Sequence, residues 1–250
     1  MIQDIPKNHP RYHSLQMRKK LSDAMKKGLV HETGLIAHGR GEAFDYMLGE
    51  QTIDSADQAE KVAAAALLLA KKPVISVNGN VVALVAEDCI NLAKQVSALI
   101  EVNLFHRTKK RITGLVEEMK QYDDVNILGA DASVRIPGLS HDRGWCEKDG
   151  IFSADVILVP LEDGDRCQAL KKMGKTVITI DLNPLSRTAK TADITIVDNV
   201  IRALPRVISW VHQLKSGNKI ILNDLVEQWD NQKTLIDACQ FMSQKLNQMD

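Results

Sequence analysis

Four short polar or glycine-rich segments contain the residues of this sequence that are best suited to bind phosphate groups. They are residues 38–45 (HGRGEAFD), 76–80 (SVNGN), 160–166 (PLEDGDR) and 181–188 (DLNPLSRT). Glycine lets backbone N–H groups approach an anion, and arginine can bind phosphate oxygens with two parallel hydrogen bonds. The segments contain no nucleophile-elbow serine and no cysteine paired with a histidine. The pattern therefore favours ligand binding and positioning over covalent catalysis by a protein nucleophile.

The first segment predicts a glycine-rich loop over residues 34–49 that runs into a short helix. Gly39 and Gly41 flank Arg40 just before that helix. Backbone amides and the Arg40 guanidinium could then hold phosphate oxygens, although the segment is neither G-x-G-x-x-G nor a Walker P-loop. His38 is a candidate catalytic acid, and a structural role in the loop is its alternative.

The SVNGN segment follows an apolar strand and precedes a helix. Gly79 permits a tight turn, and a helix that begins there offers free N–H groups to an anion. Ser76, Asn78 and Asn80 add hydroxyl and amide groups. The alternative is a simple β-turn, because Asn-Gly is a common turn dipeptide.

Three carboxylates follow the most apolar strand of the chain. Glu162, Asp163 and Asp165 could coordinate Mg²⁺, which prefers oxygen ligands together with substrate phosphates. The alternative is an acidic N-cap cluster, because Asp165 lies where a helix is expected to start.

The fourth segment also follows a buried strand. Asp181 at a strand end could bind ribose hydroxyls, and Arg187 and Thr188 could then reach phosphates. An Asn-Pro turn with an exposed arginine is the alternative.

These segments lie in a repeating pattern of apolar strands and helices. Strands are predicted at residues 73–77, 100–105, 125–129, 154–160, 176–181 and 193–198, with helices at about 82–98, 107–121 and 165–174. Strands such as VILVP are apolar throughout, as strands covered on both faces are. We therefore expect an α/β fold with a mostly parallel sheet between helical layers, and ligands at the carboxyl ends of its strands.

Further helices are expected outside this pattern, at about 14–30, 55–71 and 200–215. Residues 130–153 form a long charged loop that could act as a lid. Residues 217–250 are expected to form a helical extension that could pack on a partner subunit. The predicted organisation is one domain over residues 1–216, with a helical part to about residue 72 and a sheet part after it, followed by this extension.

Composition excludes several classes of protein. The 250 residues carry 32 basic and 32 acidic side chains, which argues against broad electrostatic binding to nucleic acid or membranes. No apolar segment is long enough for a transmembrane helix, and the N-terminus has no apolar signal core. The four scattered cysteines show neither a disulfide pattern nor zinc-ligand spacing. We expect a cytoplasmic protein.

Several long motifs together resemble archaeal phosphopantothenate synthetase, also called 4-phosphopantoate–β-alanine ligase. They are HPRYHSLQMRKK, GLIAHGRGEAFDYMLGE, PVISVNGNVVALV, IEVNLFHRT, RIPGLSHDRG, VPLEDGDR, DLNPLSRTA and ITIVDNVIRALPR. The resemblance runs nearly collinearly over residues 5–215. It implies a Rossmann-like three-layer fold, a homodimer, and ligation of 4-phosphopantoate with β-alanine in coenzyme A biosynthesis, with ATP converted to AMP and diphosphate.

The resemblance also implies roles for particular residues. The predicted ATP-binding residues are Arg18, Arg40, Asp181, Leu182, Asn183, Arg187, Thr188, Asn199 and Val200. We expect Gly39, Gly41, Ser76, Asn78, Gly79 and Asn80 to bind the phosphopantoate, Arg40, His38 and Asn78 to act in catalysis, and Asp163 and Asp165 to bind Mg²⁺. An NAD-dependent oxidoreductase and a nucleotide-sensing domain on the same fold are the alternatives.

Overall fold

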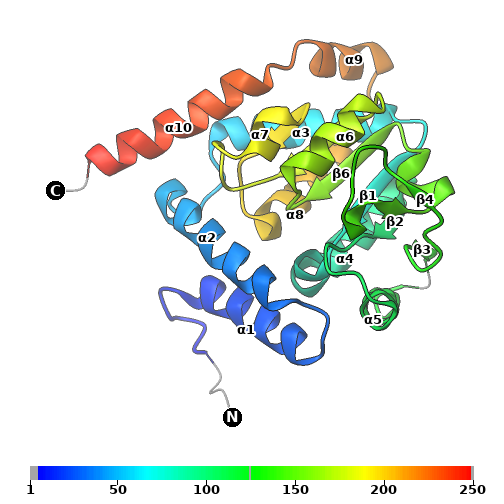
Figure 1. Ribbon diagram of the computed structural model, residues 1–250. Coiled ribbons are helices and arrows are strands. Elements are labelled where there is room, and N and C mark those ends of the chain that lie inside the picture. The colour runs from blue at the N-terminus through cyan, green and yellow to red at the C-terminus, as the bar shows by residue number, and fades with distance from the viewer. Residues whose placement is uncertain (1–4, 124, 249–250) are drawn as a thin grey trace.

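A six-stranded parallel sheet forms the centre of the computed structural model, which describes residues 5–123 and 125–248 (Figure 1). Its strand order is β3-β2-β1-β6-β7-β8, and every neighbouring pair is parallel. The strands are β1 (Pro73–Val77), β2 (Leu99–Val102), β3 (Ile127–Leu128), β6 (Val156–Pro160), β7 (Thr176–Ile180) and β8 (Ile194–Ile196). All six predicted strands are therefore confirmed, most of them a few residues shorter than expected.

Helices connect the strands and extend the chain at both ends. They are α1 (Tyr12–Lys26), α2 (Glu32–Leu48), α3 (Asp54–Leu69), α4 (Gly79–Val96), α5 (Lys109–Lys120), α6 (Gly164–Lys172), α7 (Arg187–Thr191), α8 (Val200–Leu214), α9 (Lys219–Glu227) and α10 (Asn231–Asn247). The predicted α/β fold with helical additions at both ends is confirmed. None of the described helices is long and apolar enough to span a membrane.

The sheet is buried on both faces, which explains why its strands are apolar throughout. Val74 belongs to the core under α6, whereas its neighbour Ile75 belongs to the core that α3, α4, α5 and α8 form on the other face. Ile157 and Leu158 divide between the two cores in the same way. Fully burying one such side chain contributes about 1.5–3 kcal/mol, so both helical layers are held firmly to the sheet.

Helix α2 is the main departure from the sequence-based expectation. The prediction of a glycine-rich loop over residues 34–49 is wrong, because residues 32–48 form one continuous helix. The His31 side chain caps its start by accepting a hydrogen bond from the Thr33 N–H, and Gly49 ends it in the left-handed conformation, with φ 82°.

Tertiary contacts explain why this glycine-containing segment is helical. A glycine in a helix interior costs about 1 kcal/mol relative to alanine. Against that cost, α2 buries Glu42 against α1 and Asp45 against α8, and Leu48 enters a third apolar cluster with α10. The N–H groups of Gly39 and Gly41 therefore lie inside a helix, where they bond to the preceding turn rather than to a ligand.

The segment predicted as a long loop contains a small hairpin. Strands β4 (Val134–Arg135) and β5 (Trp145–Cys146) pair antiparallel, with a short helical turn between them at Asp142–Gly144 and another after them at Lys148–Phe152. Ile136, Leu139 and Cys146 bury their side chains in the core beneath α6. The hairpin is thus packed onto the sheet domain.

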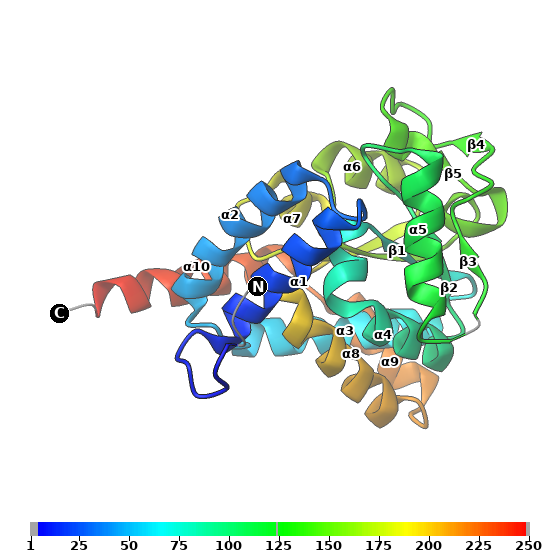
Figure 2. The same ribbon diagram turned by 90° about the horizontal axis from the view of Figure 1, so that it is seen from below.

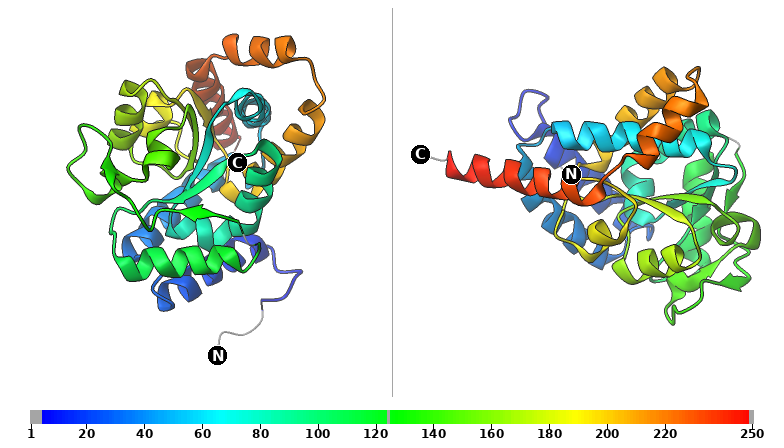
Figure 3. Two further views of the ribbon diagram at one scale, coloured as in Figure 1. Left: turned by 90° about the vertical axis from the view of Figure 1, so that its right-hand side faces the viewer. Right: turned by 90° about the horizontal axis from the view of Figure 1, so that it is seen from above.

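The helices near the two ends of the chain differ in how they pack on the sheet domain. Figure 2 shows α1 and α2 side by side. The C-terminal helix α10 packs its first turns against α3 and α7, and its far end projects beyond the body (Figure 3). Leu235, Ala238 and Met242 of α10 share the third apolar cluster with Leu48 and Val197, so the extension shares a core with the preceding domain.

Candidate active site

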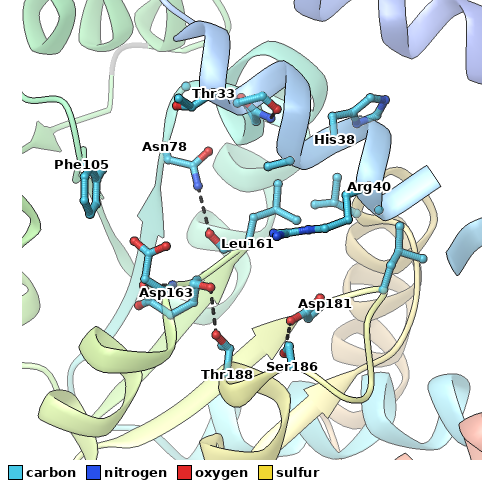
Figure 4. Close-up of a pocket in the computed structure, with 18 of the residues that line it drawn as sticks. Thr33, His38, Arg40, Asn78, Phe105, Leu161, Asp163, Asp181, Ser186 and Thr188 are labelled. Carbon is cyan, nitrogen blue, oxygen red and sulfur yellow. Dashed lines mark hydrogen bonds between the residues drawn. The ribbon is translucent and has the colours of Figure 1, made fainter. Parts of the chain in front are cut away.

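A cavity of about 660 Å³ lies at the carboxyl ends of β1, β6, β7 and β8, beneath α2 (Figure 4). Its size is typical of small-molecule sites. All four predicted segments contribute to its lining. The candidate residues among them are His38, Arg40, Gly41, Asn78, Gly79, Asn80, Glu162, Asp163, Asp181, Leu182, Asn183, Arg187 and Thr188, with Asn199 and Val200 after the end of β8. The sheet topology thus brings together segments that are far apart in the sequence.

Four predicted site residues do not line this cavity. The Gly39 backbone lies on the exposed side of α2, and Asp165 lies in the first turn of α6. Ser76 is buried, and its hydroxyl accepts a hydrogen bond of 3.0 Å from Arg166. Arg18 on α1 instead pairs with Glu42 of α2, with 2.8 Å between Nη2 and Oε2. Ser76 and Arg18 therefore bond to other side chains of the protein and not to the cavity.

Arg40 projects from α2 into the cavity (Figure 4). Within the part of the chain that the structure describes, its guanidinium makes no hydrogen bond and no ion pair. Burial raises the pKa of Asp181, and the positive charge of Arg40 partly offsets this effect. Arg40 thus places a positive charge, without an ion-pair partner among the described residues, above the ends of β6 and β7, where a phosphate group can bind it.

The ring of His38 lies on the other side of α2 from Arg40 (Figure 4). Its Nε2 is 3.9 Å from Glu42 Oε1 and has no hydrogen-bond partner among the described residues. Burial lowers the pKa of His38, which favours the neutral ring at neutral pH. The structure does not bring this ring to the groups expected to act with it.

The loop after β7 is organised around the carboxylate of Asp181. Its Oδ2 accepts a hydrogen bond of 2.5 Å from the Ser186 hydroxyl, and its Oδ1 accepts one of 2.9 Å from the Asn183 N–H. Each carboxylate oxygen has a second lone pair, so both can still accept a hydrogen bond from a ligand hydroxyl. Thr188 ties this loop to the preceding one by donating to the Glu162 carbonyl at 3.0 Å.

Each carboxylate of the acidic segment has a cationic or histidine partner. Glu162 pairs with Arg166 at 2.6 Å, Asp163 with Arg143 at 2.6 Å, and Asp165 with the His141 ring at 2.9 Å. Over residues 5–123 and 125–248, no group of three or more His, Cys, Asp or Glu side chains could hold a metal ion. This arrangement does not fit a metal site built by the protein alone.

The start of α4 faces the cavity as the sequence predicted. Asn78 caps it, accepting from the Val81 N–H at 3.1 Å and donating to the Leu161 carbonyl at 3.3 Å. Asn80 donates to the Gly34 carbonyl at 2.8 Å and so joins α4 to α2. The N–H groups of Gly79 and Asn80, the first two of α4, have no partner within the helix and can bind an anion.

The cavity also contains residues that sequence reasoning missed. Phe105 and His106 follow β2, and His106 stacks on His31 with 3.9 Å between ring centroids. Arg111 and Leu161 complete this part of the lining. The rule that ligands bind at strand ends could have identified Phe105 and His106, since Phe105 ends a predicted strand and His106 follows it. His31 had no such signal, because its position depends on how α2 packs.

Comparison with known proteins connects this cavity to an enzyme family. The phosphopantothenate/pantothenate synthetase family matches the chain over residues 55–245. The chain belongs to this family. Similar proteins named 4-phosphopantoate–beta-alanine ligase occur in Thermococcus kodakarensis and Methanosarcina mazei. The Thermococcus protein is 52% identical, and the match covers 98% of this chain and 95% of the relative. The Methanosarcina protein is 50% identical, and the match covers 98% of this chain and 97% of the relative. The relative of the same name in Methanospirillum hungatei is 48% identical, over 97% of this chain and 98% of its own.

Membership of the phosphopantothenate/pantothenate synthetase family confirms the resemblance noted in the sequence. The matched residues include α9 and nearly all of α10, so the similarity reaches into the C-terminal extension. The comparisons support neither the oxidoreductase nor the nucleotide-sensing alternative. The chain is an enzyme of the synthetase type, which implies the use of ATP.

Proposed function

We propose that this protein ligates 4-phosphopantoate with β-alanine, using ATP, to give 4′-phosphopantothenate, AMP and diphosphate in coenzyme A biosynthesis. The observation that carries the proposal is that one cavity is lined by Arg40, by the Asp181 loop and by the start of α4. The near full-length similarity to proteins named for this reaction supports it.

The sheet order divides the proposed site into two halves. We assign the nucleotide to the half formed by the ends of β7 and β8, where Asp181 can accept hydrogen bonds from ribose hydroxyls and Asn199 begins α8. We assign phosphopantoate to the half formed by β1, where Gly79 and Asn80 begin α4 and can bind its phosphate. The strand between them, β6, lies where the two substrates must react.

The proposed reaction has two steps. A carboxylate oxygen of phosphopantoate attacks the α-phosphorus of ATP, and diphosphate leaves with the electrons of the broken P–O bond. The amine of β-alanine then bonds to the acyl carbon, AMP leaves, and the ammonium proton passes to a base. Arg40 stabilises negative charge on the phosphates in the first step. Asp163 is the candidate base, because it follows the end of β6 in the cavity, whereas the His38 ring points to the other side of α2, towards Glu42.

Magnesium belongs to this proposal only as an ion that ATP brings with it. Asp163 and Asp165 are already paired with Arg143 and His141. Mg²⁺ in phosphate-transferring sites usually keeps several waters and binds substrate phosphates with few protein ligands. No step of the mechanism depends on a metal held by the protein.

A diphosphate-release assay tests the proposed function. The purified protein should turn over repeatedly only when ATP, 4-phosphopantoate and β-alanine are all present, with diphosphate and AMP in equal amounts, whereas ATP and 4-phosphopantoate alone should release at most one diphosphate per enzyme molecule. Formation of ADP and phosphate would exclude the adenylate route. Binding of ATP without turnover would favour a nucleotide-sensing domain instead.

We further propose that the protein is a cytoplasmic homodimer. An exposed apolar side of α10 supports this, because Ile236 and Leu246 are about half exposed and Leu185 lies beside Ile236 in a surface groove. Light scattering on the eluting protein should give twice the mass of one chain.

A further inference from the structure

Leu161 has a backbone conformation that its side chain disfavours. It follows β6 directly and has φ 60°, in the left-handed region. Glycine and asparagine adopt this region readily, whereas a bulky residue there is an outlier held by its surroundings.

The other described non-glycine residues with positive φ have a simple explanation. Glu50 follows the end of α2 and Ser97 ends α4, and helices commonly end in the left-handed conformation. Leu161 ends a strand and caps no helix. Since a helix terminus does not explain the positive φ of Leu161, we consider its position in the cavity as the explanation.

Backbone hydrogen bonds hold Leu161 at the centre of the site. Its N–H donates to the Ile180 carbonyl at 3.1 Å, and its carbonyl accepts from the Asn78 amide at 3.3 Å. These bonds tie it to β7 on one side and to the start of α4 on the other. With both backbone groups engaged, Leu161 lines the cavity between Asn78 and Arg40 (Figure 4).

This position lies on the boundary between the two halves of the proposed site, where β1 meets β6. The polar groups around it, Asn78 and Arg40, suit charged parts of the substrates. Leu161 presents an apolar side chain among them. Part of this side chain packs against the apolar core, and the part that lines the cavity suits an apolar part of a substrate.

We propose that Leu161 is a specificity-determining residue that contacts the two methyl groups of 4-phosphopantoate. This inference rests on the proposed function. The phosphopantoate carboxylate must meet the α-phosphate of ATP at this boundary, and the carbon that bears both methyls stands next but one to the carboxylate carbon. A leucine at the boundary therefore packs against the methyls when the carboxylate is in position to react, and the strained backbone keeps it there.

The test measures how well the enzyme distinguishes phosphopantoate from an unbranched analogue, 2-hydroxy-4-phosphobutanoate. The wild-type enzyme should prefer phosphopantoate in kcat/KM by at least roughly tenfold, a typical value for apolar contacts of this size. In L161A that preference should fall by about tenfold, while KM for ATP stays within about twofold. L161N is the second variant, because asparagine accepts a positive φ and so keeps the backbone.

The matched control is L99A, since Leu99 is an exposed leucine at the start of β2, at the opposite end of the strand from the cavity. It should keep the wild-type preference. The inference is overturned if the wild-type enzyme does not prefer the branched acid, if either folded Leu161 variant keeps the full preference, or if KM for ATP rises as much as KM for the acid. A wild-type protein that releases no diphosphate with phosphopantoate would instead refute the proposed function.

Discussion

Asn199, at the start of α8, donates a hydrogen bond of 2.7 Å to the buried carboxylate of Asp45 on α2. Arg202, one turn further along α8, donates to the same carboxylate at 2.5 Å and also binds Asp198. The helix that carries Arg40 is therefore attached to the end of the sheet by a charged cluster. This attachment sets the height of Arg40 above the site.

Replacing Asp45 should loosen this attachment. In D45A the Asn199 amide and part of the Arg202 guanidinium lose their partner, and breaking a buried ion pair from one side costs about 3 kcal/mol. We expect urea unfolding to show this loss, and kcat/KM to fall as α2 moves. D237N changes an exposed aspartate and should leave the free energy of unfolding within about 0.5 kcal/mol of wild type. Wild-type stability in D45A would show that the cluster does not hold α2.

Removing the positive charge of Arg40 should slow the reaction with little effect on stability. The side chain is exposed, and it supplies charge to the phosphates without a partner among the described residues. We expect R40A to lower kcat/KM by about 10²–10³-fold, as loss of one charge-stabilising group does. R40K should recover only part of this, because lysine lacks the paired donors. The control is R11A, which removes an exposed hydrogen bond to Tyr46. Equal activity of R40A and R11A would show that Arg40 takes no part in the reaction.

Glu60 should make stability depend on pH. Burial, with Asp198 nearby, raises the pKa of Glu60 from its ordinary 4.5 to about 8. Between these values the folded protein keeps a proton on Glu60 that the unfolded chain releases. The contribution of Glu60 to the free energy of unfolding is therefore greatest below about pH 4.5 and falls as the pH rises towards 8, by at most about 1.4 kcal/mol per pH unit. E60Q should remove this slope in urea unfolding between about pH 5.5 and 7.5. E87Q, at an exposed position, should keep it, and an unchanged slope in E60Q would contradict the assignment.

The pairing of the acidic segment leads to a prediction about magnesium. If ATP carries the ion, D163N and D165N should leave the Mg²⁺ concentration for half-maximal activity within about twofold of wild type. Their maximal rates can differ, since Asp163 lines the cavity. Titration of MgCl₂ at saturating ATP measures this concentration. A tenfold increase in either variant would indicate that the protein itself binds the metal ion.

The sheet could be predicted from the sequence because burial on both faces leaves a local signature. VILVP and TVITI are apolar throughout, and both proved to be central strands. The strand-end rule then located three of the four polar segments correctly. The identities of the substrates came from family resemblance, since the loops alone indicate only a ligand rich in phosphate.

The state of α2 could not be predicted in the same way. Its glycines indicate a loop, and the contacts that make it helical come from Ser14, Asn80 and Asn199, which are distant in the sequence. The directions in which His38 and Arg40 point depend on that helix. The sequence-based prediction therefore placed in one catalytic group two side chains that point in opposite directions. The ion pairs of Asp163 and Asp165 were hidden for the same reason, because Arg143 and His141 reach them from the hairpin segment.

The pairing of β1 with β6 has a consequence for folding. Pro73 lies beside Val156 in this pair, whereas β1 and β2 join segments that are close in the chain. Closing so long a loop costs more entropy, so this contact is expected to form after the local ones. Substrates that bind across it favour the fully assembled sheet over partly folded chains. The residues assigned to ATP follow β6 in the chain, so this effect requires the complete sheet, and ATP together with phosphopantoate should protect the full-length protein against proteolysis.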